Sequence, residues 1–246
     1  MLTALTMLAT GGTTVEKLDA MNDSSAPSGG SSSVQAAEAV SPIDLCEQIN
    51  IGWNLGNTLD STGGNGLSSE TSWGNPKATE KLILAVKEAG FNAVRIPTTW
   101  YNHMDSSYNV DAAWMDRVQE VVDYAYDNEM YVILNVHHEN WNFTSYDNQK
   151  QAEKITKKLW KQIATRFKDY DYRLIFEGMN EPRMSGTQWE WNGGNQEGWD
   201  VVNSFNETFI ETVRATGGNN EKRCLMIPSY AANIGAFEKG MKIPDD

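Results

Sequence analysis

Strand-like and helix-like segments alternate along the chain after residue 40, and this alternation restricts the fold more than any other feature. Helix-like stretches are expected at about 75–89, 111–128, 147–169 and 196–216, and Pro76 and Asp111 stand at expected helix starts. The strand-like runs are QINIGWNLG (48–56), FNAVRIP (91–97), MYVILNV (130–136), YRLIFEGMN (172–180) and RCLMIPSY (223–230). Such alternation is typical of parallel strands joined by helical crossovers.

The spacing of these units favours a barrel over an open sheet. An open sheet that binds dinucleotides carries a G-x-G-x-x-G turn after its first strand, and neither GWNLGN nor GGNGLS has that spacing. The strand-like runs recur about every 40 residues, as in a (β/α)8 barrel of roughly 250 residues. Only five runs are visible, so we predict an α/β chain with a (β/α)8 TIM barrel truncated after about five β/α units.

The first 40 residues differ in composition from the rest. Residues 1–10, MLTALTMLAT, resemble the apolar part of a signal peptide without its basic start. Residues 22–38 are rich in Ser, Gly and Ala, a composition that cannot bury a core. We therefore predict a partial signal peptide over 1–20, a flexible linker over 21–40 and one folded domain over 41–246.

The charge balance excludes polyanionic partners. The chain has 33 acidic against 20 basic residues, a formal net charge of −13, which repels nucleic acid and anionic membranes. No run of 18 apolar residues is present, so we expect no transmembrane helix. Two cysteines, Cys46 and Cys224, make no disulfide framework and are expected to be separate, buried or half-buried thiols.

Polar side chains close four successive strand-like runs. Catalytic groups of parallel barrels gather at the carboxyl ends of the strands, so these side chains are expected to form one site. They are Asn57 and Asp60, then Arg95, then His137 and His138, then Asn180 and Glu181.

Arg95 is expected to point toward the barrel axis, because its neighbours Val94 and Ile96 take the opposite side of the strand. A buried arginine needs a carboxylate partner. Glu177 lies deeper in its strand than Glu181 and is the expected structural partner. Two interpretations remain open: a plain ion pair in the core, or an arginine that keeps a catalytic carboxylate ionised.

Histidine and tryptophan content bears on the type of ligand. The chain has three histidines and no H-E-x-x-H spacing, so we predict no metal site and no cofactor. Nine tryptophans are many for this length, and a loop tryptophan either stacks on a flat apolar ligand such as a sugar ring or packs its own loop. Trp114 and Trp160 lie on helix faces and are expected in the core. Those expected in or near loops are Trp53, Trp100, Trp141, Trp189, Trp191 and Trp199.

Four motifs in order, INIGWNLGNTLD, GFNAVRIPTTW, VILNVHHENW and LIFEGMNEPR, resemble glycoside hydrolase family 5, and closely its bacterial endo-β-1,4-glucanases (cellulases). The resemblance runs from about residue 40 to the end, which makes 41–246 the catalytic domain. It implies a retaining double displacement on cellulose or related β-glucans. It also implies a secreted or cell-surface bacterial monomer with a polysaccharide substrate and no cofactor, nucleic acid or membrane partner.

The resemblance assigns roles to residues. It implies that Glu181 is the general acid/base and that Asn180 binds the substrate 2-hydroxyl. Arg95 and His137 complete the implied catalytic group. The implied substrate-binding residues are His138, Asn57, Asp60, Trp73 and Trp141.

The family also has a His-x-Tyr pair after strand six, a nucleophilic Glu after strand seven and a Trp after strand eight, and none of these is among the 246 residues. Glu177 cannot replace the nucleophile, because on an extended strand it lies about 13 Å from Glu181, against about 5–5.5 Å in a retaining pair. We therefore expect this chain to be the N-terminal part of the domain and, alone, neither stable nor active. The alternatives are a non-catalytic carbohydrate-binding fragment, or the same fold acting on xyloglucan, xylan or mannan.

Overall fold

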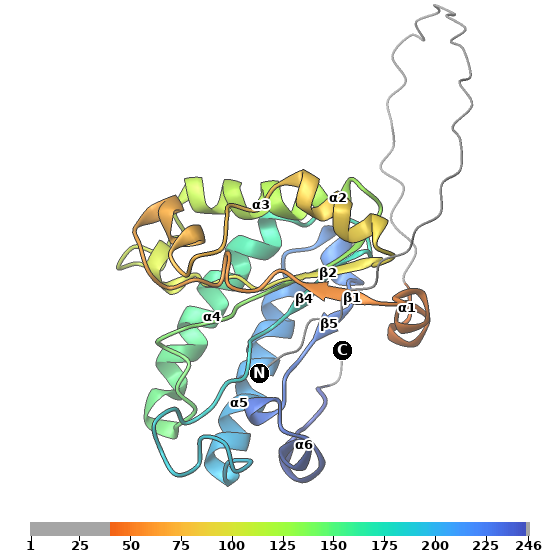
Figure 1. Cartoon of the computed structure of the whole chain (residues 1–246). Coiled ribbons are helices and arrows are strands. Elements are labelled where there is room, and N and C mark those ends of the chain that lie inside the picture. Colours follow the sequence, from red (N-terminus) through yellow and green to blue (C-terminus); the bar gives the residue numbers. More distant parts are fainter. Residues whose placement is uncertain (1–39, 245–246) are drawn as a thin grey trace, which may run out of the picture. The chain divides into compact units, whose positions relative to one another are not determined.

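The computed structural model describes residues 40–244, all within one compact unit of residues 36–246. The expected signal-peptide segment and all but the last residue of the expected linker lie outside the described residues. Five parallel strands form one sheet in the order β1-β2-β3-β4-β5 (Figure 1). The strands are β1 (Gly52–Asn54), β2 (Ala93–Ile96), β3 (Tyr131–Asn135), β4 (Leu174–Glu177) and β5 (Leu225–Met226).

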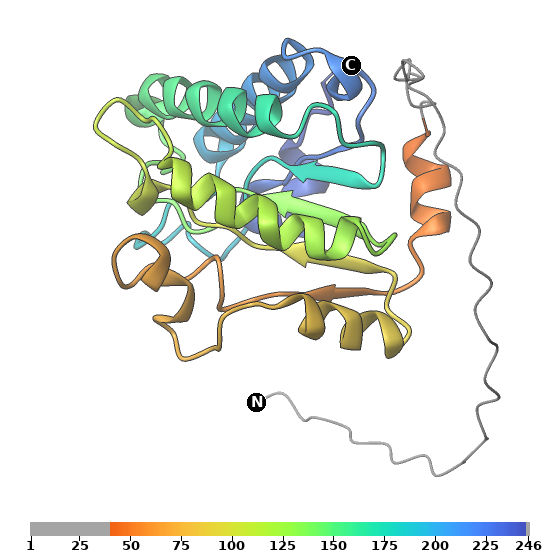
Figure 2. The same ribbon diagram turned by 90° about the horizontal axis from the view of Figure 1, so that it is seen from above.

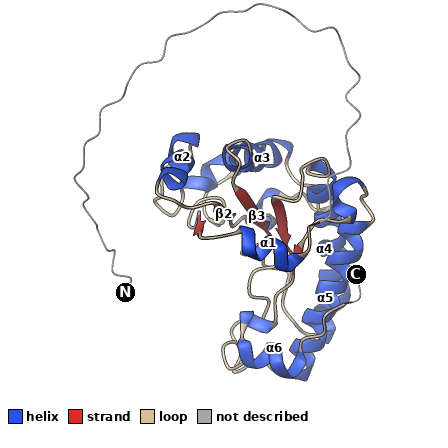
Figure 3. Ribbon diagram, turned by 90° about the vertical axis from the view of Figure 1, so that its right-hand side faces the viewer, coloured by secondary structure: helices blue, strands red, loops and turns tan. Residues whose placement is uncertain are grey.

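Helices connect successive strands, as the alternation predicts. The α-helices are α1 (Pro42–Gln48), α2 (Glu80–Glu88), α3 (Ala112–Tyr126), α4 (Tyr146–Arg166), α5 (Gln196–Arg214) and α6 (Ile234–Gly240). Short 3-10 helices lie at η1 (Gly66–Thr71), η2 (Tyr101–His103), η3 (Gly218–Glu221) and η4 (Tyr230–Ala232). Helix α3 runs beside β2 and β3 (Figure 2), and α4 packs along α5 (Figure 3). The parallel sheet with helical crossovers is therefore confirmed.

The main core lies between the sheet and the helices. Alternate strand residues such as Val94, Ile96 and Leu134 are fully buried in the same cluster as Trp114 of α3 and Trp160 of α4. The expected core positions of these two tryptophans are confirmed. Because strand side chains alternate, Arg95 is left on the opposite face, as its neighbours predict.

One of the two expected helix starts is correct. Asp111 caps α3 by accepting hydrogen bonds from the N–H groups of Ala113 and Trp114. Pro76 does not start α2, which begins at Glu80 after its cap, Thr79. The residues between them are not helical, and there the buried Glu70 carboxylate accepts the N–H of Ala78 at 2.7 Å.

The cysteines are both free, but Cys46 is exposed rather than buried. Helix α1 is short and buries only Leu45, so the thiol of Cys46 falls outside the core. Cys224 is half-buried, as expected, and burial raises the pKa of its thiol. Within residues 40–244, no helix is long and apolar enough to cross a membrane.

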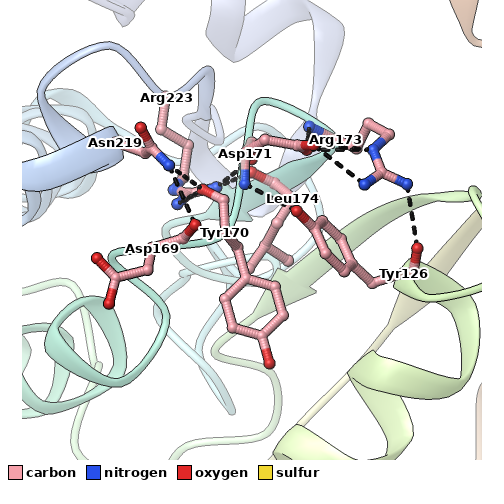
Figure 4. Close-up of polar contacts among 8 residues, drawn as sticks. All are labelled: Tyr126, Asp169, Tyr170, Asp171, Arg173, Leu174, Asn219 and Arg223. Carbon is pink, nitrogen blue, oxygen red and sulfur yellow. Dashed lines mark hydrogen bonds and ion pairs between the residues drawn. The ribbon is translucent and has the colours of Figure 1, made fainter. Parts of the chain in front are cut away.

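A buried arginine closes the corner between α4 and β4 (Figure 4). Arg223 is 1% exposed and donates to the backbone carbonyls of that corner. Asn219 donates to two carbonyls of the same corner, those of Asp169 and Tyr170. Burial lowers the pKa of Arg223 to about 10, which leaves it charged at neutral pH. The carbonyls that accept from Arg223 are those of Phe167, Tyr170, Asp171 and Leu174, at 2.6–3.0 Å.

We predict that Arg223→Met, in the full protein, lowers the free energy of unfolding by about 3–5 kcal/mol, because the carbonyls of this corner lose a buried, charged donor. Urea unfolding followed by circular dichroism measures the change. Arg166→Met is the matched control: this arginine is exposed, pairs with Asp116 and should cost less than about 1 kcal/mol. Equal losses in the two variants would contradict the role given to Arg223.

Candidate active site

Arg95 and Glu177 form a two-pronged ion pair between β2 and β4. Arg95 Nε donates to Glu177 Oε2 and Nη2 to Oε1, both at 2.6 Å. Glu177 is 9% exposed, so the pair is largely shielded from water. The predicted pairing of these two residues is confirmed. Arg95 also donates Nη1 to Asn54 Oδ1 at 3.0 Å and Nη2 to Asn180 Oδ1 at 3.1 Å.

Asn180 is fixed at both its backbone and its side chain. Its N–H donates to the carbonyl of Val136 at 2.8 Å, which continues the sheet beyond the last residue of β4. Its Oδ1 accepts from Arg95. The amide NH2 group of Asn180 therefore points away from that bond, and no hydrogen bond among residues 40–244 uses it. This group can donate to a ligand.

Glu181 has a strained backbone. Its φ is +44°, a left-handed value that non-glycine residues rarely adopt, and Pro182 follows it. Strain of this kind gathers at functional sites, where the surrounding structure holds it. Arg183 Nη1 donates to the carbonyl of Glu181 at 3.0 Å and lies 3.7 Å from its Oε2. The Glu181 carboxylate is 41% exposed and so is accessible to a ligand.

Two histidine rings follow β3. The N–H of His137 donates to the carbonyl of Thr98 at 2.8 Å, and its ring meets that of His138 edge-on at 4.4 Å. Burial, together with the nearby His138 and Arg95, lowers the pKa of His137 to about 3. The pKa of His138 is also lowered, mainly by burial, with nearby acidic groups acting in the opposite direction. Both rings are therefore neutral at pH 7.

Asp60 reaches the same place from the loop after β1. Its Oδ1 accepts the N–H of Thr58 at 2.7 Å. One donor atom from each of Asp60, His137 and His138 lies within 4.8 Å of the others, a spacing that an ion could bridge. However, the Asn135 amide occupies Nδ1 of His137 at 3.0 Å. One oxygen of Asp60 and one ring nitrogen of His137 are therefore already hydrogen-bonded within the protein, and the absence of a metal site stays a prediction.

The loop that carries Trp73 is anchored by a second buried ion pair. Arg117 of α3 donates to both oxygens of Glu70 at 2.9 and 2.7 Å, and both residues are buried. Trp73 is 44% exposed, and its ring lies 5.5 Å from that of His138. The structure therefore brings an exposed indole beside the histidines.

Trp141 is held by a carboxylate that the sequence did not single out. Its Nε1–H donates to Glu139 Oε2 at 2.5 Å, and the other oxygen of Glu139 accepts the N–H of Trp100 at 2.7 Å. Burial of the carboxyl raises the pKa of Glu139 to about 8, against these two donors, although part of the residue is exposed. Glu139 thereby fixes the orientation of the Trp141 ring.

Two further loop tryptophans and Asn57 differ in their exposure and contacts. Trp100 is wholly buried and donates Nε1–H to the carbonyl of Asn135, so of the two roles left open for a loop tryptophan it has the packing one. Trp191 is 61% exposed, with Arg183 above its ring at 4.2 Å. Asn57 is exposed at φ +59°, and no hydrogen bond within the described part of the chain links its side chain to the group.

We predict that Glu139→Gln changes how stability depends on pH. The folded-state pKa of about 8 lies above the value of about 4.3 for an unfolded glutamate, so the native state binds this proton more tightly. The stabilisation is complete below about pH 4 and is lost as pH rises through about 8. The melting temperature of the wild type minus that of Glu139→Gln should therefore fall between pH 5 and 8.5.

Calorimetry of the full protein at four or five pH values measures this difference. Glu47→Gln, at an exposed position of α1, is the matched control and should give a flat difference. A flat difference for Glu139→Gln as well would contradict the shifted pKa.

The comparisons with known proteins agree with this arrangement. Residues 57–246 match the cellulase (glycosyl hydrolase family 5) family model. Endoglucanase B of Neocallimastix patriciarum is 50% identical over 209 residues, which are 81% of this chain and 44% of that protein. Endoglucanase A of Ruminococcus albus is 49% identical over 211 residues, 84% of this chain and 58% of that protein. The chain spans about half the length of the curated relatives it matches.

Solved structures give the same result. A GH5-4 broad specificity endoglucanase from Ruminococcus champanellensis, with bound cellotriose, aligns with a TM-score of 0.83 and 50% identity over 85% of this chain and 64% of that one. A GH5 xyloglucan-specific endo-β-1,4-glucanase from a metagenomic library, in complex with cellotriose, aligns with a TM-score of 0.81 and 49% identity over 83% and 62%. The chain belongs to glycosyl hydrolase family 5, and its five β/α units form part of a (β/α)8 barrel.

Proposed function

We propose that the chain is part of a retaining, endo-acting glycoside hydrolase that cleaves β-1,4-glucosidic bonds in cellulose or related β-glucans. The observation that carries the proposal is the accessible carboxylate of Glu181 at a strained position directly after Asn180, at the carboxyl end of β4. Endoglucanase relatives at about 50% identity support the reaction class.

Each polar group has a role in this proposal. Glu181 protonates the leaving glycosidic oxygen and then, as a base, activates water. The NH2 group of Asn180 donates to the 2-hydroxyl, a bond that strengthens in an oxocarbenium-like transition state. Arg95 holds the oxygen of Asn180 and so keeps the NH2 group pointing at the sugar. The exposed indole of Trp73 and the clamped indole of Trp141 provide faces on which sugar rings stack.

The double displacement also needs a nucleophilic carboxylate about 5–5.5 Å from that of the acid/base. Both oxygens of Glu177 accept from Arg95, so this residue does not serve. The proposal therefore requires a nucleophile from outside the five described strands. The non-catalytic alternative predicts a protein that binds β-glucan but releases no reducing ends from it. Measuring both binding and release of reducing ends therefore separates this alternative from the hydrolase.

Substrate preference within the β-glucans is a finer proposal. One solved neighbour is named as xyloglucan-specific and another as a broad specificity endoglucanase, so xyloglucan is the first alternative substrate. Initial rates on carboxymethyl cellulose, mixed-linkage glucan, xyloglucan, xylan and mannan separate the alternatives. We also propose that the protein acts as an extracellular monomer, because a polymeric substrate cannot enter a cell. Its presence in culture fluid at the mass of one chain tests this.

We predict that Glu181→Ala slows hydrolysis of carboxymethyl cellulose by about 10²–10⁴-fold in the full protein. An aryl glycoside with a good leaving group needs no protonation, so formation of its glycosyl-enzyme should survive. Azide should then speed turnover, because it attacks that intermediate without a general base. Glu221→Ala, at an exposed position before β5, is the control. Rates on cellulose close to wild type would rule out Glu181 as acid/base.

A second prediction concerns the charge beside the site. Arg95→Lys should lose most activity, on the order of 100-fold in kcat/KM, while the fold persists, since one ammonium cannot replace a fork that holds Glu177 and Asn180 together. Circular dichroism checks the fold. Arg166→Lys, on the outer surface of α4, should keep normal activity. Normal turnover in Arg95→Lys would mean that Arg95 only forms a structural ion pair and has no part in catalysis.

A further inference from the structure

The fully buried Asn135, the last residue of β3, touches groups on three strands or their extensions. Its Oδ1 accepts the N–H of Thr98, after β2, at 3.0 Å. Its Nδ2 lies 3.3 Å from Oε1 of Glu177 on β4. The same Nδ2 lies 3.0 Å from Nδ1 of His137. Every polar end of this amide is therefore in contact with a partner.

These partners fix which end of the amide faces which neighbour. The N–H of Thr98 can only donate, so it must meet the amide oxygen. The carboxylate of Glu177, paired with Arg95, can only accept, so it must meet the amide nitrogen. A flipped amide would break both bonds. Asn135 therefore presents N–H, and not oxygen, to the ring of His137.

The orientation of Asn135 determines where the His137 proton lies. A ring nitrogen that accepts from an amide N–H must carry its lone pair, so Nδ1 of His137 is unprotonated. The low pKa of this ring makes it neutral, and its single proton then sits on Nε2. Within residues 40–244, no hydrogen bond uses Nε2, so this N–H is available to a ligand.

We propose that Asn135 is a positioning residue that sets the tautomer of His137, so that Nε2–H is offered as a hydrogen-bond donor to a sugar oxygen. The ligand assignment rests on the proposed function; the tautomer does not. Asn135 reaches the substrate only through His137. The relay runs from the backbone N–H of Thr98 through the amide to the ring. It supplies a fixed donor without a charge in the site.

An aspartate at position 135, which has the same shape, should switch His137 to its other tautomer. A carboxylate at position 135 still accepts the N–H of Thr98, but it cannot donate to Nδ1 of His137. The proton then moves to Nδ1, where it can bind the new carboxylate, and Nε2 becomes an acceptor. Asn135→Asp is therefore a change of one atom that converts a donor facing the ligand into an acceptor.

Ring ¹⁵N NMR of the histidine-labelled full protein at pH 7 tests the proposal directly. In this protein, the signal lost in His137→Gln assigns the ring of interest. We expect the Nε2–H tautomer in the wild type and in Asn203→Asp, a control at another buried asparagine. In Asn135→Asp, we expect the ring to be protonated on Nδ1.

A wild-type ring protonated on Nδ1, or an unchanged tautomer in a folded Asn135→Asp, would overturn the proposal. The wild-type spectrum decides even if the variant fails to fold, and it needs no catalytic activity, so failure of the proposed function is seen separately. In the active protein, Asn135→Asp should lower kcat/KM by about 10–100-fold. Adding it to His137→Gln should cost little more, whereas a purely structural role would give additive losses.

Discussion

The ion pair between Arg95 and Glu177 is the contact on which the rest of the site depends. The pair joins β2 to β4 across β3. Arg95 also donates to Asn54 and Asn180, and Glu177 also accepts from Asn135. Removing one partner of such a buried pair leaves an uncompensated charge, at a typical cost of about 3–5 kcal/mol. Asn54 on β1, Asn135 on β3 and Asn180 after β4 would lose a hydrogen-bond partner at the same time. Stability and site geometry are therefore coupled through one pair of side chains.

The site is built mainly from amides whose direction is set by charged neighbours. Arg95 accepts no hydrogen bond and binds the oxygen of Asn180, which leaves the NH2 group of Asn180 open. Glu177 accepts from the nitrogen of Asn135, which turns that nitrogen toward His137 as well. Dipoles held in this way need no reorganisation when charge develops on a ligand. The backbone ties of His137 and Asn180 to neighbouring strands add rigidity where the sheet ends.

The succession of strand-like and helix-like segments predicted the parallel sheet. The period of two along β2 predicted the inward direction of Arg95, and the cost of burying an unpaired arginine predicted a carboxylate partner in Glu177. These patterns could not predict the burial of Trp100 or its bond to Glu139, which join two loops 39 residues apart, nor that Glu139 also holds the Trp141 ring. The left-handed backbone of Glu181 was also not predictable, since a residue before proline normally avoids that region. The direction of the Asn135 amide could be read only from its contacts with Thr98 and Glu177 in the folded structure.

Arg223, which closes the corner between α4 and β4, imposes an order on folding during translation. Four carbonyls between residues 167 and 174 accept hydrogen bonds from Arg223, which lies 49–56 positions later in the sequence. At about 5–20 residues per second, a ribosome takes roughly 3–10 s to reach it. Until then the corner between α4 and β4 has only water or nearby groups to bond. A nascent chain paused within that interval would therefore present an unfinished corner to chaperones, and synthesis of Arg223 would complete it.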